Sequence, residues 1–145
     1  MPASKAEQVL DALKALLATV PGAAVERNSV LPEKIPAGGL IILRDGDPGE
    51  PEQSLGGFGS TYYQHAAEIE VYVEEGDAAT RDAAFDDLLQ QIGAALEADP
   101  NLDGLAFGLT YGRPEPAIEA VSGAPAIKTA RLTVTVDYES DAPLS

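Results

Sequence analysis

The stretch YQHAAEIEVYVE, from Tyr63 to Glu74, decides the fold predicted from this sequence. Taking every second residue gives one largely apolar set and one largely polar set: Tyr63, His65, Ala67, Ile69, Val71 and Val73 against Gln64, Ala66, Glu68, Glu70, Tyr72 and Glu74. Side chains of a strand point alternately to its two faces, so the pattern predicts a long strand with one buried face and one exposed acidic face. A helix would spread the glutamates around its surface. The predicted sheet is therefore covered on one side only.

Two amphipathic helices are predicted to cover the buried face. The first begins at the capping box Ser4-Lys5-Ala6-Glu7 and is ended by Pro21-Gly22. The second follows a turn at Glu75-Gly76-Asp77, with Asp77 or Thr80 as its N-cap. The apolar residues recur at three- and four-residue spacing in both: Val9, Leu10, Leu13, Leu16, Leu17 and Val20, then Ala84, Phe85, Leu88, Leu89, Ile92, Ala95 and Leu96.

The remaining strands are predicted at residues 23–28, 39–44, 105–111 and 130–139. Pro114 and Pro116 close the third of these, and residues 118–126 read as a loop. The element order is then α-β-β-β-α-β-β, which predicts an α+β fold. We expect a two-layer sandwich with a mainly antiparallel four- to five-stranded sheet and two helices on one face. The expected organisation is a single domain over residues 1–145, with a loose C-terminal segment at 140–145.

A long connection, DGDPGEPEQSLGGFGST at residues 45–61, separates two of the predicted strands. It has no periodicity, and loops longer than about 12–15 residues are uncommon in compact domains unless they are functional or disordered. We therefore expect this loop to contact a partner or another subunit. The candidate contact residues are Asp45, Asp47, Glu50, Leu55 and Phe58.

The charge of the chain is strongly negative and unevenly distributed. The formal net charge is −15, and residues 45–103 hold fifteen acidic residues against one base, Arg81. Such a field repels nucleic acids and anionic membranes. The absence of cysteine excludes disulfides and thiolate chemistry. The polar N-terminus and the lack of a long apolar run lead us to expect a soluble protein with no signal peptide or membrane span.

No residue pattern predicts a catalytic, metal or cofactor site. His65 is the only histidine, and its place on the buried face favours a structural role. The segment from Asp45 to Glu50 lacks the spacing of a calcium loop, and the glycine-rich segment from Leu55 to Ser60 lacks the lysine of a phosphate-binding loop. Glu68 and Glu70 are expected to be exposed, which leaves their pKa values too similar for paired acid–base work.

Several segments together resemble the tail terminator family of long-tailed phages, of the minor tail protein U type that includes prophage and gene-transfer-agent versions. The resemblance spans essentially the whole chain. The segments that carry it are VPG and VERN at 20–28, LIILRDGDPGEPE at 40–52, YQHAAEIEVYV at 63–73, the run from Arg81 to Leu105, and KTARLTVTVDYES at 128–140.

The resemblance implies a structural virion protein without enzymatic activity or cofactor. Such a protein would cap the tail tube as a hexameric ring, end tube polymerisation and form the head–tail joining surface. Its implied partners are further copies of itself, the tail tube protein and the head–tail connector protein. DNA would pass through the ring without specific binding, and no membrane is involved. The implied location is the virion tail, after assembly in the bacterial cytoplasm.

The resemblance also suggests that Glu68, Glu70 and Glu74 line an acidic channel, although an ordinary exposed sheet face explains these residues equally well. Two alternatives to a terminator stay open. One is a related head–tail connector or tail-tube assembly protein. The other is a small ligand-binding or enzymatic α+β domain in which the glycine-rich loop covers Tyr63 and His65.

Overall fold

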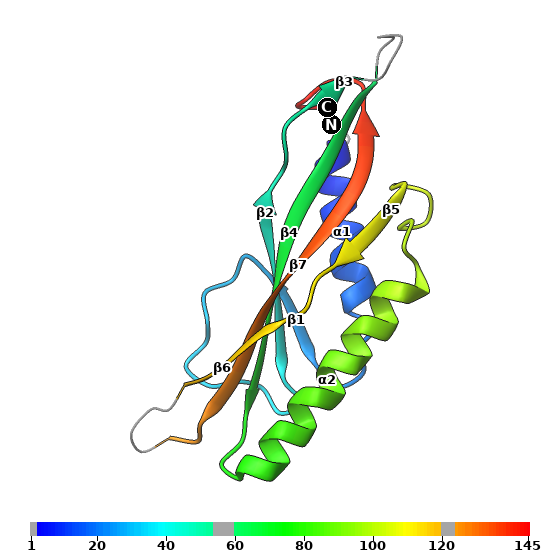
Figure 1. The fold of residues 1–145 in the computed structure, drawn as a ribbon. Helices are drawn as coiled ribbons and strands as arrows, with labels where there is room; N and C mark the ends of the chain where they lie inside the picture. The colour runs from blue at the N-terminus through cyan, green and yellow to red at the C-terminus, as the bar shows by residue number, and fades with distance from the viewer. Residues whose placement is uncertain (1–2, 54–59, 120–123) are drawn as a thin grey trace.

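The alternating segment forms strand β4, Thr61–Glu74, in the middle of a twisted sheet (Figure 1). Strand β7, Ile127–Ser140, pairs with it antiparallel along its whole length, from Thr61 opposite Ser140 to Glu74 opposite Ile127. The computed structural model describes residues 3–53, 60–119 and 124–145. Within them, the predicted inward residues Ile69, Val71 and Val73 of β4 are buried. The alternation prediction is therefore confirmed.

The sheet has the order β1-β2-β4-β7-β5, with two short strands added beside this path. Strand β2, Leu40–Asp47, is antiparallel to β4, and β1, Ala24–Arg27, is parallel to β2. Strands β5, Gly108–Tyr111, and β6, Glu115–Glu119, both pair antiparallel with β7, while β3, Glu52–Gln53, pairs with β4. The fold is thus α+β with a mainly antiparallel sheet, as predicted, and β3 and β6 extend the predicted strand set.

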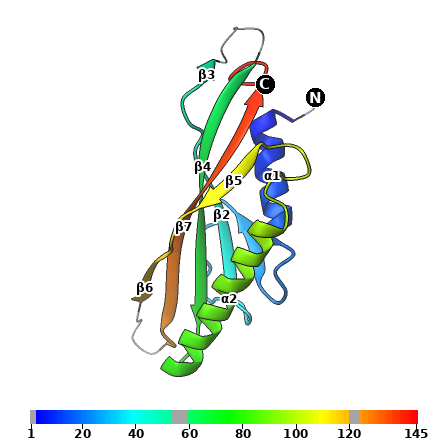
Figure 2. The ribbon, with the colours of Figure 1, turned by 45° about the vertical axis from the view of Figure 1, so that its right-hand side comes forward.

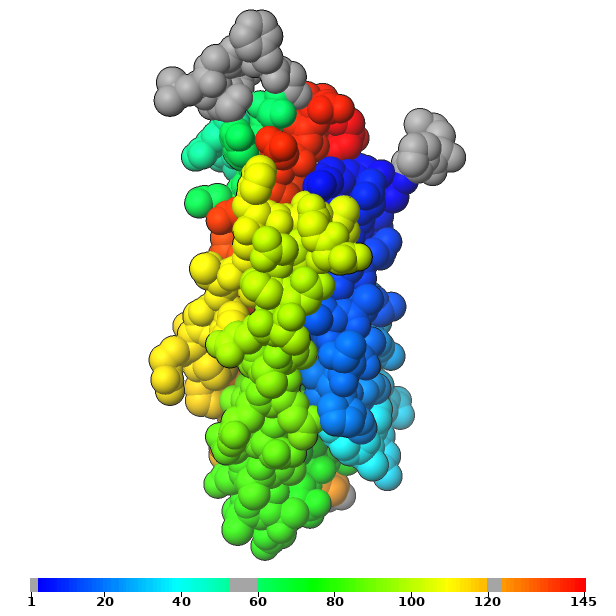
Figure 3. Space-filling view, turned by 90° about the vertical axis from the view of Figure 1, so that its right-hand side faces the viewer, coloured from blue at the N-terminus to red at the C-terminus, as the bar shows by residue number. Residues whose placement is uncertain are grey.

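Helices α1, Lys5–Leu17, and α2, Ala78–Ala98, cover one face of the sheet (Figure 2). They lie beside each other on that side of the molecule (Figure 3). Ser4 caps α1 by accepting a hydrogen bond from the Glu7 N–H at 3.2 Å, and Asp77 caps α2 through the Thr80 N–H at 2.9 Å. No helix in the described part of the chain has the length and apolar character needed to cross a bilayer.

The core between helices and sheet follows the predicted apolar stripes. Both helices contribute leucines, and the strands contribute the inward residues of β2, β4 and β7. The fully buried members include Val9, Leu13, Leu17, Ile41, Leu43, Ile69, Val71 and Leu96. At roughly 1.5–3 kcal/mol for each large apolar side chain removed from water, this layer supplies most of the driving force for folding.

Two of the strand predictions need correction. The strand expected at 105–111 begins only at Gly108, because Leu102, Asp103 and Gly104 adopt positive φ angles in a turn that precedes it. Strand β6 begins at Glu115, between the two prolines expected to close the preceding strand, and runs into the loop expected at 118–126. It is an edge strand, where a residue without an N–H such as Pro116 is tolerated.

The face of the sheet opposite the helices is not wholly open. The connection at residues 28–39 passes over it and buries Ile35 against Leu40 and Ile42 in a second small cluster. Partly buried Ala24, Tyr72 and Ile127 pack around these three residues. We call this side of the sheet the outer face. The expectation that all of it meets solvent or another subunit is therefore wrong for the part beneath this connection.

The segments expected to be irregular also have defined contacts. Strand β2 runs on to Asp47, so the predicted loop starts after that residue, and a register shift lies between Arg44 and Asp47. At the other end of the chain, the Lys5 N–H at the start of α1 donates to the Ser145 carbonyl at 3.2 Å. Residues 141–145 are exposed, and Ser145 contacts the start of α1 through this bond.

Candidate functional site

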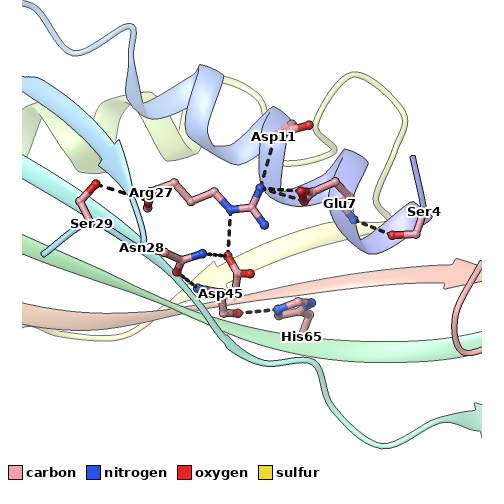
Figure 4. Close-up of polar contacts among 8 residues, drawn as sticks. All are labelled: Ser4, Glu7, Asp11, Arg27, Asn28, Ser29, Asp45 and His65. Atoms are coloured by element: carbon pink, nitrogen blue, oxygen red, sulfur yellow. Dashed lines mark hydrogen bonds and ion pairs between the residues drawn. The ribbon is translucent and has the colours of Figure 1, made fainter. Parts of the chain in front are cut away.

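Arg27 joins three elements at the edge of the sheet (Figure 4). It ends β1, and its side chain points toward α1, where Nη1 lies 2.8 Å from a Glu7 carboxylate oxygen and 3.4 Å from Asp11. Its Nε donates to Asp45 on β2 at 2.8 Å. The capping-box pattern assigns the Glu7 carboxylate to the Ser4 N–H, yet this carboxylate binds Arg27. The guanidinium therefore links α1, β1 and β2.

The charges in this cluster stabilise one another. The hydrogen bond from Arg27 lowers the pKa of Asp45 below its ordinary value, against the opposing effect of burial, and the Asn28 side chain adds to the lowering. The bond to Asp45, followed by that to Glu7, raises the pKa of Arg27 above its ordinary value although burial opposes this. Both residues are thus held in their charged forms, which suits a structural link rather than proton transfer.

His65 lies beside this cluster, on the inward face of β4, and is only 3% exposed. Its Nε2 is 2.6 Å from the Asp45 carbonyl oxygen, and its Nδ1 is 3.0 Å from the Tyr138 hydroxyl. A carbonyl oxygen can only accept, so Nε2 carries the hydrogen, and in the neutral ring Nδ1 accepts from Tyr138. Burial raises the pKa of Tyr138 and keeps this donor protonated. Both ring nitrogens are engaged, which agrees with the structural role predicted for His65.

A second polar cluster lies on the outer face, where Glu70 is 8% exposed. The expectation that Glu70 is exposed is therefore wrong. Tyr72 donates to its carboxylate at 2.8 Å, Arg44 at 3.3 Å, and Arg131 lies 3.7 Å away. Arg131 also lies 3.8 Å from Glu68, so this one base of β7 contacts both glutamates of β4. Two bases thus neutralise two acids at this point of the sheet.

Burial and hydrogen bonding compete within this outer cluster. Burial by itself raises the pKa of Glu70, but the bonds from Tyr72 and Arg44 and the nearby Arg131 reverse the effect, and the net pKa lies below its ordinary value. Burial and the bond to Glu70 raise the pKa of Tyr72 to about 12. The pair is therefore a charge-assisted hydrogen bond between an ionised carboxylate and a neutral phenol.

Glu74, the third acid suggested for a channel, lies apart from this cluster. It is six residues from Glu68 along β4, or about 20 Å at the usual rise of a strand. It lines a hollow of about 370 Å³ between the 28–39 connection and α2, with Asp87, Leu88 and Gln91 in the wall. The structure thus brings Glu68 and Glu70 together with two arginines and leaves Glu74 at the end of the strand.

The residues proposed for subunit contacts divide into three groups. Asp45 is half-buried and bound to Arg27, and Asp47 accepts a hydrogen bond from the Gly49 N–H at 2.9 Å. Glu50 is exposed. Leu55 and Phe58 lie outside the described residues. Arg27 was not singled out from the sequence, although Glu7 and Asp11, one helical turn apart, could have indicated that a base faces this side of α1.

The described residues offer little to catalytic chemistry. They contain no group of three or more histidine, aspartate or glutamate side chains placed to hold a metal ion. The polar atoms of the Arg27 and Glu70 clusters bond mainly to one another. The arrangement is therefore that of polar links between structural elements.

The comparisons with known proteins cover family models, curated proteins and solved structures. The chain matches no model of a known protein family and no curated protein. Among solved structures, it is similar to a chain in a structure titled "Virion of native gene transfer agent (GTA) particle", at 18% sequence identity and a TM-score of 0.38. The match covers 95% of this chain and 96% of that chain.

Proposed function

We propose that this protein is a structural subunit of a phage or phage-like particle that caps the tail tube as a hexameric ring. The ring would end tube polymerisation and present the surface for head–tail joining. Its partners would be neighbouring copies, the tail tube protein and the head–tail connector protein. The mature location would be the virion tail, after assembly in the bacterial cytoplasm.

One structural observation carries the assignment to an assembly subunit. Both helices lie on one side of the sheet, and beyond the 28–39 connection the outer face of β4 and β7 has no covering element among the described residues. It presents mixed polar and aromatic side chains: Tyr62, Gln64, Arg131 and Thr133 are exposed. A ring needs two different complementary surfaces on each subunit, and this face together with the loop after β2 supplies candidates. The resemblance to tail terminators supports the more specific role.

The charge of the chain is compatible with a channel through which DNA passes without binding. Like charge keeps a duplex from adhering to the wall. Glu68 keeps 38% of its side chain exposed, whereas Glu70 is buried between Arg44 and Arg131. Within the proposed ring, Glu68 and Glu74 would therefore contribute more to an acidic lumen than Glu70.

A capping assay tests this function directly. Purified protein is added to growing tail tubes, tube lengths are measured by electron microscopy, and the mass of the protein is followed by light scattering. We expect substoichiometric protein to stop elongation and a species of six times the monomer mass to form alone or on tubes. Protein that extends the tubes would identify a tube-assembly protein instead. Protein that neither caps tubes nor assembles would contradict the proposal.

Matched charge variants show whether the loop after β2 takes part. Glu50 is exposed in that loop, and Asp103 is exposed in the turn after α2. We expect Glu50→Lys to weaken capping and Asp103→Lys to leave it unchanged, since the two substitutions change the net charge equally. Equal effects would point to net charge alone rather than to a contact at the loop.

The alternative of a ligand-binding or enzymatic domain centres on Tyr63 and His65. Both side chains are buried, and His65 is bonded through both nitrogens. A strictly monomeric protein that binds a small molecule, with affinity lost in His65→Ala, would support this alternative. Because His65→Ala also removes structural hydrogen bonds, its thermal unfolding must be measured beside the binding.

A further inference from the structure

Two exposed aromatic rings contact each other at one end of the outer face. Tyr62 lies near the start of β4 and is 36% exposed, and Phe107 lies just before β5 and is 57% exposed. Their ring centroids are 5.7 Å apart, and the Phe107 N–H donates to the Asp137 carbonyl at 2.8 Å, which fixes Phe107 beside β7. Single exposed apolar residues are ordinary, but adjoining aromatic rings form an apolar surface that is typical of interaction sites.

Acidic residues surround this aromatic pair. Glu52 on β3 and Glu139 on β7 are the direct cross-strand neighbours of Tyr62, and residues directly opposite in antiparallel strands share a face. Asp137 lies two residues from Glu139 along β7, on the same face, and its Oδ1 is buried without a hydrogen-bond partner among the described residues. The rim of the pair is therefore negative.

One base, Lys5, adjoins the rim, and the rim acids together with Asp141 outnumber it. Lys5, at the start of α1, shares a hollow of about 360 Å³ with Glu139 and Asp141. Arg131 is six residues from Asp137 along β7, about 20 Å at the rise of a strand, and lies against Glu68 and Glu70. The surface around the two rings thus combines exposed aromatic faces with excess negative charge.

We propose that Tyr62, Phe107 and the rim glutamates form a docking surface for a protein segment that carries arginine or lysine among apolar side chains. Aromatic faces attract cations through the ring quadrupole, and the rim carboxylates complement the same charge. A second copy of this chain is the poorer occupant, because two molecules with a net charge of −15 repel each other. Tyr62 also belongs to the outer face proposed as a candidate ring surface, so the test uses the isolated chain and a peptide probe, and its outcome does not depend on ring formation.

The probe is a short fluorescent synthetic peptide with two arginines and two leucines, and the readout is fluorescence anisotropy at physiological salt. We expect Tyr62→Ser/Phe107→Ser to weaken binding about tenfold or more, as removal of central interface aromatics does. The control is Val30→Ser/Ile118→Ser, which removes two similarly exposed apolar side chains elsewhere. Wild-type affinity in the aromatic variant, or equal losses in both variants, would overturn the proposal. If Tyr62→Ser/Phe107→Ser unfolds at a lower temperature than the wild type, the single variant Phe107→Ser replaces it in the binding measurement.

A second pair of variants separates local from overall charge. Glu52→Gln/Glu139→Gln removes two rim charges, whereas Glu33→Gln/Asp86→Asn removes two exposed acids on the 28–39 connection and α2, away from the rings in the sequence. We expect the rim pair to weaken peptide binding at least about threefold more than the remote pair, because short-range pairs are screened less by salt. Equal effects would mean that the peptide only follows net charge. Self-association of the wild type that is lost in Tyr62→Ser/Phe107→Ser would make a second copy the occupant and overturn the basic-partner assignment.

Discussion

Replacing Arg27 by methionine tests whether one guanidinium holds α1, β1 and β2 together. Arg27→Met keeps a long flexible side chain but removes the contacts to Glu7 and Asp45 at 2.8 Å and to Asp11 at 3.4 Å. We expect a lower free energy of unfolding with an unchanged fold, because the apolar core between the helices and the sheet does not include this residue.

The expected loss follows from the exposure of the partners. Charge-assisted hydrogen bonds contribute about 1.5–3 kcal/mol each when desolvated. The Glu7 and Asp45 side chains are 43% and 45% exposed, so water replaces much of what they lose, and each contact is worth about 0.5–1 kcal/mol. The sum is about 1–2 kcal/mol. For a chain of this size that lowers Tm by about 2–8 °C.

The assay is urea unfolding of the wild type, Arg27→Met and the control Arg113→Met. Arg113 is exposed and has no ion pair within the described residues, so its loss changes the net charge equally. The free energy of unfolding of Arg113→Met should lie within about 0.5 kcal/mol of the wild-type value. If Arg27→Met and Arg113→Met unfold with the same free energy, Arg27 acts only through net charge and the link between the three elements is refuted.

The pH dependence gives a second measurement on the same variant. Arg27 lowers the pKa of Asp45 in the folded state below its ordinary value of 3.8. A group with a depressed folded pKa stabilises the fold above its unfolded pKa, and that contribution is lost as the pH falls through the folded pKa. The difference in free energy of unfolding between wild type and Arg27→Met should therefore have its full size near pH 7 and become smaller below about pH 4. A difference that grows in acid would contradict this assignment.

Two further predictions concern Gly46 and Tyr72. A Cβ on Gly46, at φ +70°, would lie 2.1 Å from a main-chain oxygen of β4, so Gly46→Ala should cost more than about 2 kcal/mol in urea unfolding. A Cβ on Gly76 would meet no atom within 4 Å, so the free energy of unfolding of Gly76→Ala should stay within about 0.5 kcal/mol of the wild-type value. Tyr72→Phe should lower the free energy of unfolding by about 1 kcal/mol, because it removes the hydrogen bond to Glu70. It should also remove a tyrosine that titrates at about pH 12 in ultraviolet absorbance. The contribution of this bond to stability is complete below about pH 10 and is lost as the pH rises through about 12. An unchanged alkaline titration in that variant would contradict the assignment to Tyr72.

The sequence predicts the core residues correctly where the spacing of apolar residues repeats with the period of a helix or a strand. The alternation in β4 and β7 and the apolar stripes of α1 and α2 predict which residues enter the core, because burial of one face imposes that period. The inward position of His65 followed from the same alternation. The sequence does not predict β6, since Pro114 and Pro116 are typical of a strand end and no local signal marks a strand as an edge.

The two polar clusters could not be predicted because their members are distant in the sequence. Arg27 meets Glu7 and Asp45 only because β1 lies parallel to β2 beneath α1, and strand order is not readable from periodicity. Glu70 was expected to be exposed because alternation reports which face a side chain takes, not what covers that face. Here the bonds from Tyr72 and Arg44 enclose it, and Leu31 of the 28–39 connection lines the same hollow as Glu70.

The way the fold uses its bases makes its surface more acidic than the composition suggests. Of nine basic residues, Arg27, Arg44, Lys128 and Arg131 form ion pairs between elements, and Arg81 is buried with Nη1 bonded to the Glu75 carbonyl. These bases connect strands and helices, and all of them except the exposed Arg131 are largely withdrawn from contact with other molecules. Exposed carboxylates on α2 and in the connections have few such partners. Contacts between copies must therefore rest on apolar and hydrogen-bonding groups and strengthen as salt screens repulsion, whereas contacts with a basic partner must weaken. The opposite salt responses separate a ring of identical subunits from docking at Tyr62 and Phe107.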